Sequence, residues 1–246
     1  MDLNNRVVLL TGARRIGAVV AAAVATRGAD VAIAYNRSAA EATEAAARIQ
    51  ALGRKALVVQ ADVSDPASCE ALIANVERSF GRLDVLVNMA SFYQAVIFDE
   101  LDVEKWDHQL AIDLRGAFLC AKAAVPVMRK VGGGRIINFS DWVAASNRPR
   151  YKGYVAYYVA KAGVKALTEA LALELAIDGI LVNAIAPGPI LAPPDTTDAA
   201  SQAVEQATPL GRWGGPEEIV KAVLALIDSD FITGETIRVD GGRHVY

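Results

Sequence analysis

Short apolar segments rich in Val and Ile alternate with longer Ala-rich segments along the whole chain. Each short segment is apolar at nearly every position, as in strands of a parallel sheet that is covered by helices on both faces. The expected strands are Val7–Leu10, Val31–Tyr35, Ala56–Gln60, Val85–Val87, Ile136–Phe139, Leu181–Ile185 and Thr236–Val239. The expected helices are Ala18–Arg27, Ala39–Leu52, Ala67–Phe80, Asp113–Arg129, Val155–Ala176 and Pro216–Ile227. Joined by right-handed crossovers, they predict an α/β fold with one doubly wound parallel sheet of about seven strands.

The composition limits the class of protein. At 246 residues, of which 53% are hydrophobic, the chain fits a single domain over residues 1–246. The formal net charge of −3 gives no long-range attraction to nucleic acid or to an anionic membrane. No apolar stretch is long enough to span a bilayer, and residues 1–5 lack a signal-peptide pattern, so we expect a cytoplasmic protein.

The cysteines and histidines are few. Cys69 and Cys120 fall on different expected helices, and His108 and His244 are isolated in the sequence. Two cysteines in a chain of this size are more often buried apolar residues than a disulfide. No spacing typical of metal ligands is present, so we expect no metal.

A glycine-marked turn follows the first expected strand and precedes an Ala- and Val-rich helix. Gly12 and Gly17 would allow a tight turn that aims the start of the helix at a pyrophosphate. This order of strand, glycine turn and helix is typical of a Rossmann-type dinucleotide site. We therefore expect Gly12, Arg14, Arg15, Ile16 and Gly17 to bind a cofactor.

The end of the second expected strand favours NADP(H) over NAD(H). An NAD site would place an acid there for the ribose 2′-hydroxyl, but this chain has Asn36, Arg37 and Ser38. Arg37 and Ser38 can bind a 2′-phosphate, with help from Arg14. The alternative is that Arg37 is a solvated residue at a helix start. Asp62, after the third strand, either accepts from the adenine amino group or serves as a turn or cap residue.

Tyr157 and Lys161 are the candidate catalytic pair. Positions i and i+4 of a helix share a face, so the two side chains project into one space. An ammonium group beside a phenol favours the phenolate, so Lys161 is expected to lower the pKa of Tyr157 toward the range of an acid/base catalyst.

The main irregular segment runs from residue 187 to residue 197 and contains four prolines. It follows a strand at the carboxyl edge of the sheet, where such folds bind ligands, and predicts a substrate loop near residues 187–205. The alternative is a mobile surface loop without a role in binding.

Six motifs, in order, give the chain a resemblance to the short-chain dehydrogenase/reductases over essentially its whole length. They are Thr11-Gly12…Gly17, Ala61-Asp62-Val63, Leu86-Val87-Asn88-Met89-Ala90, Tyr157…Lys161, Asn183 to Gly188, and Thr233-Gly234…Asp240-Gly241-Gly242. The resemblance implies hydride transfer from or to a nicotinamide, with Tyr157 as proton donor and Lys161 on the nicotinamide ribose. It also implies cofactor contacts by Val63, Asn88, Ala90, Pro187 and Gly188, and a homotetramer.

Three positions depart from the family pattern. The glycine turn is one residue short, Asp141 stands where the catalytic Ser aligns, and Asp113 stands for the usual Asn. The first two departures resemble the pteridine reductases, as do Asn36 to Ala42 and the segment with Ser91 and Phe92, whose ring would stack on a flat substrate. The sixteen residues from Asp141 to Tyr157 exceed the spacing in those enzymes.

Asp141 limits the class of substrate, because a carboxylate can only accept hydrogen bonds and would repel a carbonyl oxygen. It would therefore hold a proton, with its pKa raised by burial, or face a substrate with N–H donors, as aminopterins have. Alternatively, Asp141 caps the next segment and Ser140 acts in its place.

We expect a reductase of a pterin-like or other conjugated C=N or C=O substrate. A 3-oxoacyl-thioester or small carbonyl reductase and an inactive nucleotide-binding homologue are the alternatives.

Overall fold

A parallel sheet forms the centre of the molecule. The computed structural model describes residues 1–12, 14–194 and 196–246, so Ala13 of the glycine turn and Asp195 of the expected substrate loop lie outside the described residues. Within that part of the chain the sheet has seven strands in the order β3-β2-β1-β4-β5-β6-β7, and every pairing is parallel. The strands are β1 (Val7–Thr11), β2 (Asp30–Tyr35), β3 (Ala56–Gln60), β4 (Val85–Asn88), β5 (Gly134–Phe139), β6 (Ile180–Pro187) and β7 (Thr236–Val239). The predicted doubly wound α/β fold is confirmed.

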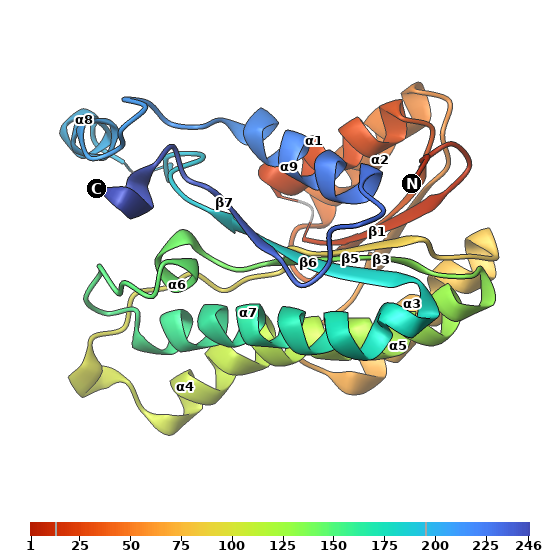
Figure 1. Cartoon of the computed structure of the whole chain (residues 1–246), viewed down its shortest axis with the longest axis horizontal. Coiled ribbons are helices and arrows are strands. Elements are labelled where there is room, and N and C mark those ends of the chain that lie inside the picture. Colours follow the sequence, from red (N-terminus) through yellow and green to blue (C-terminus); the bar gives the residue numbers. More distant parts are fainter. Residues whose placement is uncertain (13, 195) are drawn as a thin grey trace.

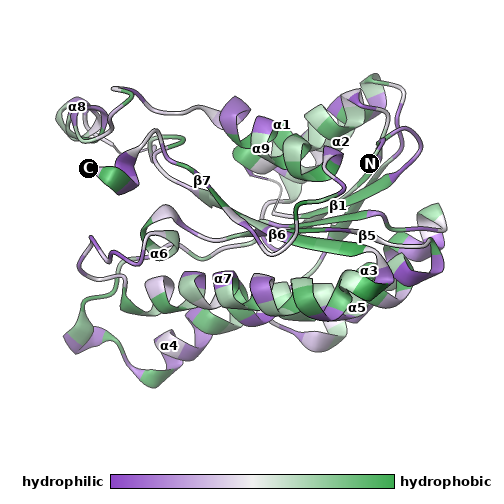
Figure 2. Ribbon diagram, in the orientation of Figure 1, coloured by the Kyte–Doolittle hydropathy of each residue, from purple (hydrophilic) through white to green (hydrophobic). Residues whose placement is uncertain are grey.

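Helices cover both faces of the sheet (Figure 1). They are α1 (Ile16–Thr26), α2 (Ala39–Ala51), α3 (Pro66–Phe80), α4 (Val103–Leu110), α5 (Gly116–Lys130), α6 (Trp142–Ala145), α7 (Val155–Leu175), α8 (Asp198–Gln206) and α9 (Pro216–Asp228). One apolar core lies between the sheet and α1, α2 and α9, and the other lies between the sheet and α3, α5 and α7. Figure 2 shows β1 mainly in hydrophobic colours, which agrees with its five buried residues.

The strand order places a ligand site at one edge of the sheet. The chain leaves β1 for β2 on one side and later returns to β4 on the other side, so the loops after β1 and β4 diverge. Thr11 and Asn88 pair in register at the carboxyl ends of these two strands. Such a reversal point is where open parallel sheets bind ligands.

Three local features differ from the sequence predictions. The helix expected to begin at Asp113 begins at Gly116, because residues 111–115 form a single π-helical turn. The expected substrate loop near 187–205 ends within a helix, α8. Both α8 and α4 were missed because their sequences are largely polar. Among the described residues, no helix combines the length and apolarity needed to cross a membrane.

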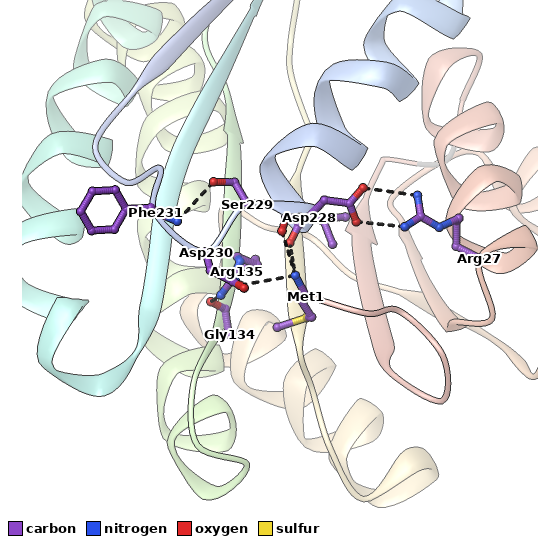
Figure 3. Close-up of polar contacts among 9 residues, drawn as sticks. Met1, Arg27, Gly134, Arg135, Asp228, Ser229, Asp230 and Phe231 are labelled. Carbon is purple, nitrogen blue, oxygen red and sulfur yellow. Dashed lines mark hydrogen bonds and ion pairs between the residues drawn. The ribbon is translucent and has the colours of Figure 1, made fainter.

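The opposite edge of the sheet, at the amino ends of the strands, is joined by ion pairs (Figure 3). Arg135, at the start of β5, pairs with Asp230 after α9 at 2.5 Å. Arg27 at the end of α1 pairs with Asp228 at the end of α9 at 3.0 Å. These contacts fix α9 against the sheet at the end remote from the cavity described next.

Candidate active site

A cavity of about 1320 Å³ opens at the carboxyl ends of the strands. Most of the residues predicted from the sequence line it. They are Gly12, Arg14, Arg15, Ile16, Gly17, Asn36, Arg37, Ser38, Asp62, Val63, Ala90, Ser91, Phe92, Asp141, Tyr157, Pro187 and Gly188. The fold therefore brings residues from eight separate loops and helices to one space, whereas Asn88, Asp113 and Lys161 lie behind its wall.

The glycine turn has a geometry that only glycine allows. Gly12 has a φ of +97°, and a Cβ on it would lie 3.3 Å from the Met89 backbone. A Cβ on Gly17 would lie 2.1 Å from the carbonyl oxygen of Gly12, so the first turn of α1 packs directly on the turn. Arg15 precedes α1 with a φ of 51° and donates a hydrogen bond to the carbonyl oxygen of Ala192. The turn is thus joined to the segment after β6.

The cavity wall beyond β2 carries positive charge. Arg14 and Arg37 both line it, and Arg14 forms an exposed ion pair with Glu41 at 3.3 Å. Asp62 also lines it, but its carboxylate accepts from the backbone N–H and the hydroxyl of Ser64, and these bonds lower its pKa. The cap of α3 is Asp65, not Asp62, so the cap alternative for Asp62 is wrong and its turn role is confirmed.

Tyr157 and Asp141 are in direct contact. The Tyr157 hydroxyl donates to a carboxylate oxygen of Asp141 at 2.9 Å, and the other oxygen accepts from the N–H of Val143 at 2.9 Å. Asp141 therefore caps α6 and faces the cavity at once. Ser140 points away, because its hydroxyl donates to the carbonyl oxygen of Lys161 within the protein at 2.8 Å. Asp141, and not Ser140, therefore faces the cavity.

Lys161 is buried beneath the tyrosine ring. Its ammonium lies 5.7 Å from the Tyr157 ring centre, 2.9 Å from Asp113 and 2.9 Å from the carbonyl oxygen of Phe139. The Asp113 carboxylate also accepts from the Ser91 hydroxyl, the Phe92 N–H and the Gln109 amide. This network connects the π-helical turn, the catalytic helix α7 and the segment after β4.

Burial and the two carboxylates set the protonation of the site. Burial, then Asp141 and Asp113, raise the pKa of Tyr157 well above its ordinary value. Burial also raises the pKa of Asp141, more than its hydrogen bonds lower it. The expected lowering of the Tyr157 pKa is wrong here, because burial and the two carboxylates raise it. A phenol that keeps its proton at neutral pH can act as a proton donor.

The Asn88 side chain points away from the cavity, and the cofactor contact expected of this residue stays a prediction. Its amide donates to the side-chain oxygen of Asn138 at 2.9 Å and to the carbonyl oxygen of Ala117 at 3.3 Å. Thr11 occupies the neighbouring position, where its hydroxyl accepts from the N–H groups of Met89 and Ala90. Both residues hold β1, β4 and β5 together under the site.

Sequence reasoning missed an aromatic wall at the far side of the cavity. Tyr93 stacks on Tyr154 with ring centres 4.8 Å apart, and its edge-on neighbour is Tyr157 at 4.9 Å. Arg243, near the end of the chain, also lines the cavity. The tyrosine at 93 directly follows the expected substrate residues, which is a local signal. Nothing near Arg243 in the sequence marks it as a site residue.

Comparisons with known proteins identify the family. The model of the family described as "Enoyl-(Acyl carrier protein) reductase" matches residues 12–244. The chain belongs to the short-chain dehydrogenase/reductase family. It is 37% identical to a 3-oxoacyl-[acyl-carrier-protein] reductase of Synechocystis sp., over 99% of both chains. Membership makes the protein an oxidoreductase, as predicted from the motifs.

Solved structures share the fold. A short-chain dehydrogenase/reductase from Serratia marcescens superposes with a TM-score of 0.91 at 32% identity, over 99% of this chain and 100% of that one. A blue fluorescent protein from a metagenomic library, in complex with NADPH, has a TM-score of 0.91 at 31% identity over 99% of both chains. These similarities establish the family, while the resemblance to its pteridine-reductase branch stays a prediction.

Proposed function

We propose that the protein is an NADPH-dependent reductase of a conjugated C=N or C=O substrate, with a flat, pterin-like heterocycle as the preferred class. The contact between Asp141 and Tyr157 carries the proposal. A carboxyl group, not a hydroxyl, stands 2.9 Å from the candidate proton donor and opens onto the same cavity. An amino-heterocycle offers N–H donors to such a group, whereas a simple ketone offers none.

The residues at the glycine turn fit NADPH. Gly12 and Gly17 let the turn pack tightly on the Met89 backbone and on the first turn of α1, and the start of α1 has no side-chain cap and borders the cavity, where a pyrophosphate would bind. Arg37 and Ser38 line the adenosine end, and no acid stands at the end of β2. The NADPH complex of the similar metagenomic protein supports the same assignment.

NADPH would supply a hydride to the substrate carbon. Tyr157 then donates its proton to the nitrogen or oxygen that gains charge, because its raised pKa keeps the phenol protonated until then. Lys161 stabilises the phenolate that is left, although its pairing with Asp113 at 2.9 Å reduces that effect. Asp141 orients the phenol and accepts from the substrate, and when it carries a proton it can also donate.

A second candidate is a reductase of 3-oxoacyl thioesters or small carbonyl compounds. It is supported by the 37% identity to the Synechocystis 3-oxoacyl-[acyl-carrier-protein] reductase over 99% of both chains. Asp141 weighs against it, since its carboxyl group already accepts from the Tyr157 hydroxyl at 2.9 Å and a simple ketone offers it no N–H donor.

The decisive experiment is a screen of NADPH oxidation with the purified protein. The panel is 7,8-dihydropterins, quinones and 3-oxoacyl thioesters, each compared by kcat/KM. Highest kcat/KM for a dihydropterin supports the proposal, and highest kcat/KM for a thioester supports the second candidate. Tight NADPH binding without turnover of any panel member would indicate an inactive nucleotide-binding homologue.

We also propose a homotetramer in the cytoplasm. Apolar side chains are exposed on α5 and α7, including Phe118 at 40% and Leu173 at 82% exposure. Exposed apolar surface of this kind is typical of protein contacts. Light scattering coupled to size exclusion measures the mass, and a monomer would contradict this part of the proposal.

A further inference from the structure

The far end of the cavity carries two arginines grouped around one tryptophan. Trp142 is the first residue of α6 and directly follows Asp141. The guanidinium carbon of Arg150 lies 5.5 Å from the Trp142 ring centre, and that of Arg243 lies 5.4 Å from it. Arg150 belongs to the loop before α7 and Arg243 to the segment after β7, so the fold brings them together from distant parts of the sequence. Both arginines line the cavity.

Neither guanidinium forms an ion pair with a described acidic side chain. Arg243 donates to the carbonyl oxygen of Val204 at 3.1 Å and to the Thr208 hydroxyl at 3.3 Å. It also reaches the Tyr151 hydroxyl at 3.4 Å. Arg150 donates to the main-chain oxygen of Tyr246. Neutral oxygens thus hold the Arg243 guanidinium in place without cancelling its charge.

A continuous wall of aromatic rings leads from Tyr157 to these arginines. Tyr154 lies 6.1 Å from Tyr157, Tyr151 lies 6.3 Å from Tyr154, and Trp142 lies 6.4 Å from Tyr151, measured between ring centres. Successive rings are nearly perpendicular, at 72–74°. A flat substrate with its reacting bond at Tyr157 would lie along this wall and direct its other end to the arginines.

The charges at this end of the cavity favour an anion. The acidic side chain there is Asp141, whose carboxyl group accepts hydrogen bonds from the Tyr157 hydroxyl and the Val143 N–H. Two arginines therefore stand against one carboxyl group among the described lining residues at this end. The guanidinium fork matches the paired oxygens of a carboxylate or phosphate, and stacking on an aromatic ring holds that fork in one orientation.

We propose that Arg150 and Arg243 form a subsite for an anionic oxygen group, carboxylate or phosphate, at the end of the substrate remote from the reacting bond. The subsite deepens the proposed reductase function and rests on it. It defines the substrate class as an aromatic or conjugated carbonyl or imine compound that carries an acidic group.

The test compares probes that differ only in charge. The probes are 4-acetylbenzoate, 4-acetylphenyl phosphate and the neutral 4-acetylbenzamide, with 6-carboxy-7,8-dihydropterin and its carboxamide as the heterocyclic pair. The quantity measured is the ratio of kcat/KM for the acid to kcat/KM for the amide on one enzyme preparation. This ratio does not depend on the folded fraction. The unsubstituted protein should favour an acid by at least about tenfold, the scale of a hydrogen bond to a charged group.

Three variants show which arginines cause the preference for the acid over the amide. Arg243→Gln and Arg150→Gln should each lower the acid-to-amide ratio about tenfold or more. Arg148→Gln is the matched control, because Arg148 comes from the same loop as Arg150, donates to the His244 carbonyl oxygen at 3.3 Å and does not line the cavity. An equal ratio for acid and amide in the unsubstituted protein overturns the subsite, and so does an equal fall in all three variants. Whichever acid gives the higher ratio identifies the anion.

A binding measurement separates failure of the subsite from failure of the proposed function. If no probe is reduced, quenching of tryptophan fluorescence by 4-acetylbenzoate and by 4-acetylbenzamide is titrated in the presence of NADPH. Tighter binding of the benzoate, lost in Arg243→Gln and retained in Arg148→Gln, supports the subsite even though the proposed reaction fails. Equal affinity for the two compounds overturns the subsite.

Discussion

The ammonium of Lys161 lies 2.9 Å from a carboxylate oxygen of Asp113, and both side chains are nearly inaccessible to solvent, at 3% and 0% exposure. The pair lies behind the cavity wall, between the catalytic helix and a π-helical turn. Burial, and then the carboxylates of Asp141 and Asp113, raise the pKa of Tyr157, so the phenol retains its proton. Asp113, at a position where the resemblance to the family implies Asn, thus adds a carboxylate near Tyr157.

This ion pair should be essential to stability. Removing one member of a buried pair costs about 3–5 kcal/mol, because the other charge remains buried without a partner. Asp113→Asn and Lys161→Met should each lower the free energy of unfolding, and the double variant should lose less than the sum of the two. Urea unfolding measures all three. Lys165→Met, which removes an exposed contact with Glu169 at 3.7 Å, is the control and should change stability by less than about 1 kcal/mol. Additive losses would show that the two charges do not interact.

The stability of the protein should depend on pH through Asp141. Burial raises the pKa of this carboxyl above its ordinary value of 3.8. A raised folded pKa means that the folded state binds the proton more tightly, so this contribution is present below pH 3.8 and is lost as pH rises through the folded pKa. Asp141→Asn removes the titrating group and keeps a side chain that can cap α6. The variant should therefore gain stability relative to the parent between acidic and neutral pH. Urea unfolding across that interval measures the difference, and a difference independent of pH would contradict the raised pKa.

Tyr157→Phe should abolish most of the activity. The phenol is the group that donates to Asp141, and loss of a general acid lowers the rate by at least about a hundredfold. The ring remains, so NADPH affinity measured by fluorescence titration should be kept. Tyr158→Phe is the matched control, since Tyr158 lines the same cavity but lies three residues from Lys161. A larger loss in Tyr158→Phe would assign the proton donor to the neighbouring residue.

Arg37→Asp should change the preference between cofactors. Arg37 lines the cavity beyond β2, where the aspartate would repel a 2′-phosphate and could accept from a ribose hydroxyl. NADPH binding should weaken by at least about tenfold, while NADH binding should change little. Isothermal titration with each cofactor measures the two affinities. Arg48→Asp on the following helix, α2, where Arg48 contacts Glu44 and does not line the cavity, is the control. Equal affinity of the unsubstituted protein for both cofactors would sink the assignment.

The sequence predicted those parts of the fold that local pattern determines. The strands Ala56–Gln60 and Thr236–Val239 have their predicted bounds. For Ala56–Gln60 the reason is a nearly continuous run of apolar residues, which indicates a strand of a parallel sheet without reference to its neighbours. The helices α4 and α8 were missed, since Val103–Leu110 and Asp198–Gln206 are short and polar overall, and such short segments give a weak periodic signal. Their helical form depends on tertiary contacts and on caps such as Asp102 and Thr197.

In the candidate site, too, the sequence predicted some features and not others. The glycine turn and the pair Tyr157 and Lys161 were predictable because short spacings encode their geometry. The direction of the Asn88 side chain was not predictable, because its amide donates hydrogen bonds to residues of β5 and α5 that are distant in the sequence. Arg243 enters the cavity only because the chain after β7 returns to α6. Burial likewise reversed the expected shift of the Tyr157 pKa, and burial is a property of the folded chain.

The strongest test of the proposed substrate class is the comparison of Asp141 with Ser140. Asp141 contacts Tyr157, whereas the Ser140 hydroxyl is turned inward to the Lys161 carbonyl oxygen. Asp141→Asn keeps the shape but removes the charge and the ability to hold and pass a proton, so reduction of a dihydropterin should fall at least about tenfold. Ser140→Ala, the control, removes only a hydrogen bond to a carbonyl within α7 and should leave the rate within a few-fold.

Asp141→Ser supplies a hydroxyl that can donate to a carbonyl oxygen, so the ratio of kcat/KM for a simple ketone to that for a dihydropterin should rise. If Ser140→Ala were the damaging change and Asp141→Asn were silent, Asp141 would be only the cap of α6. The preference for an amino-heterocycle would then lose its physical basis, and the thioester or simple carbonyl reductase would be the better assignment.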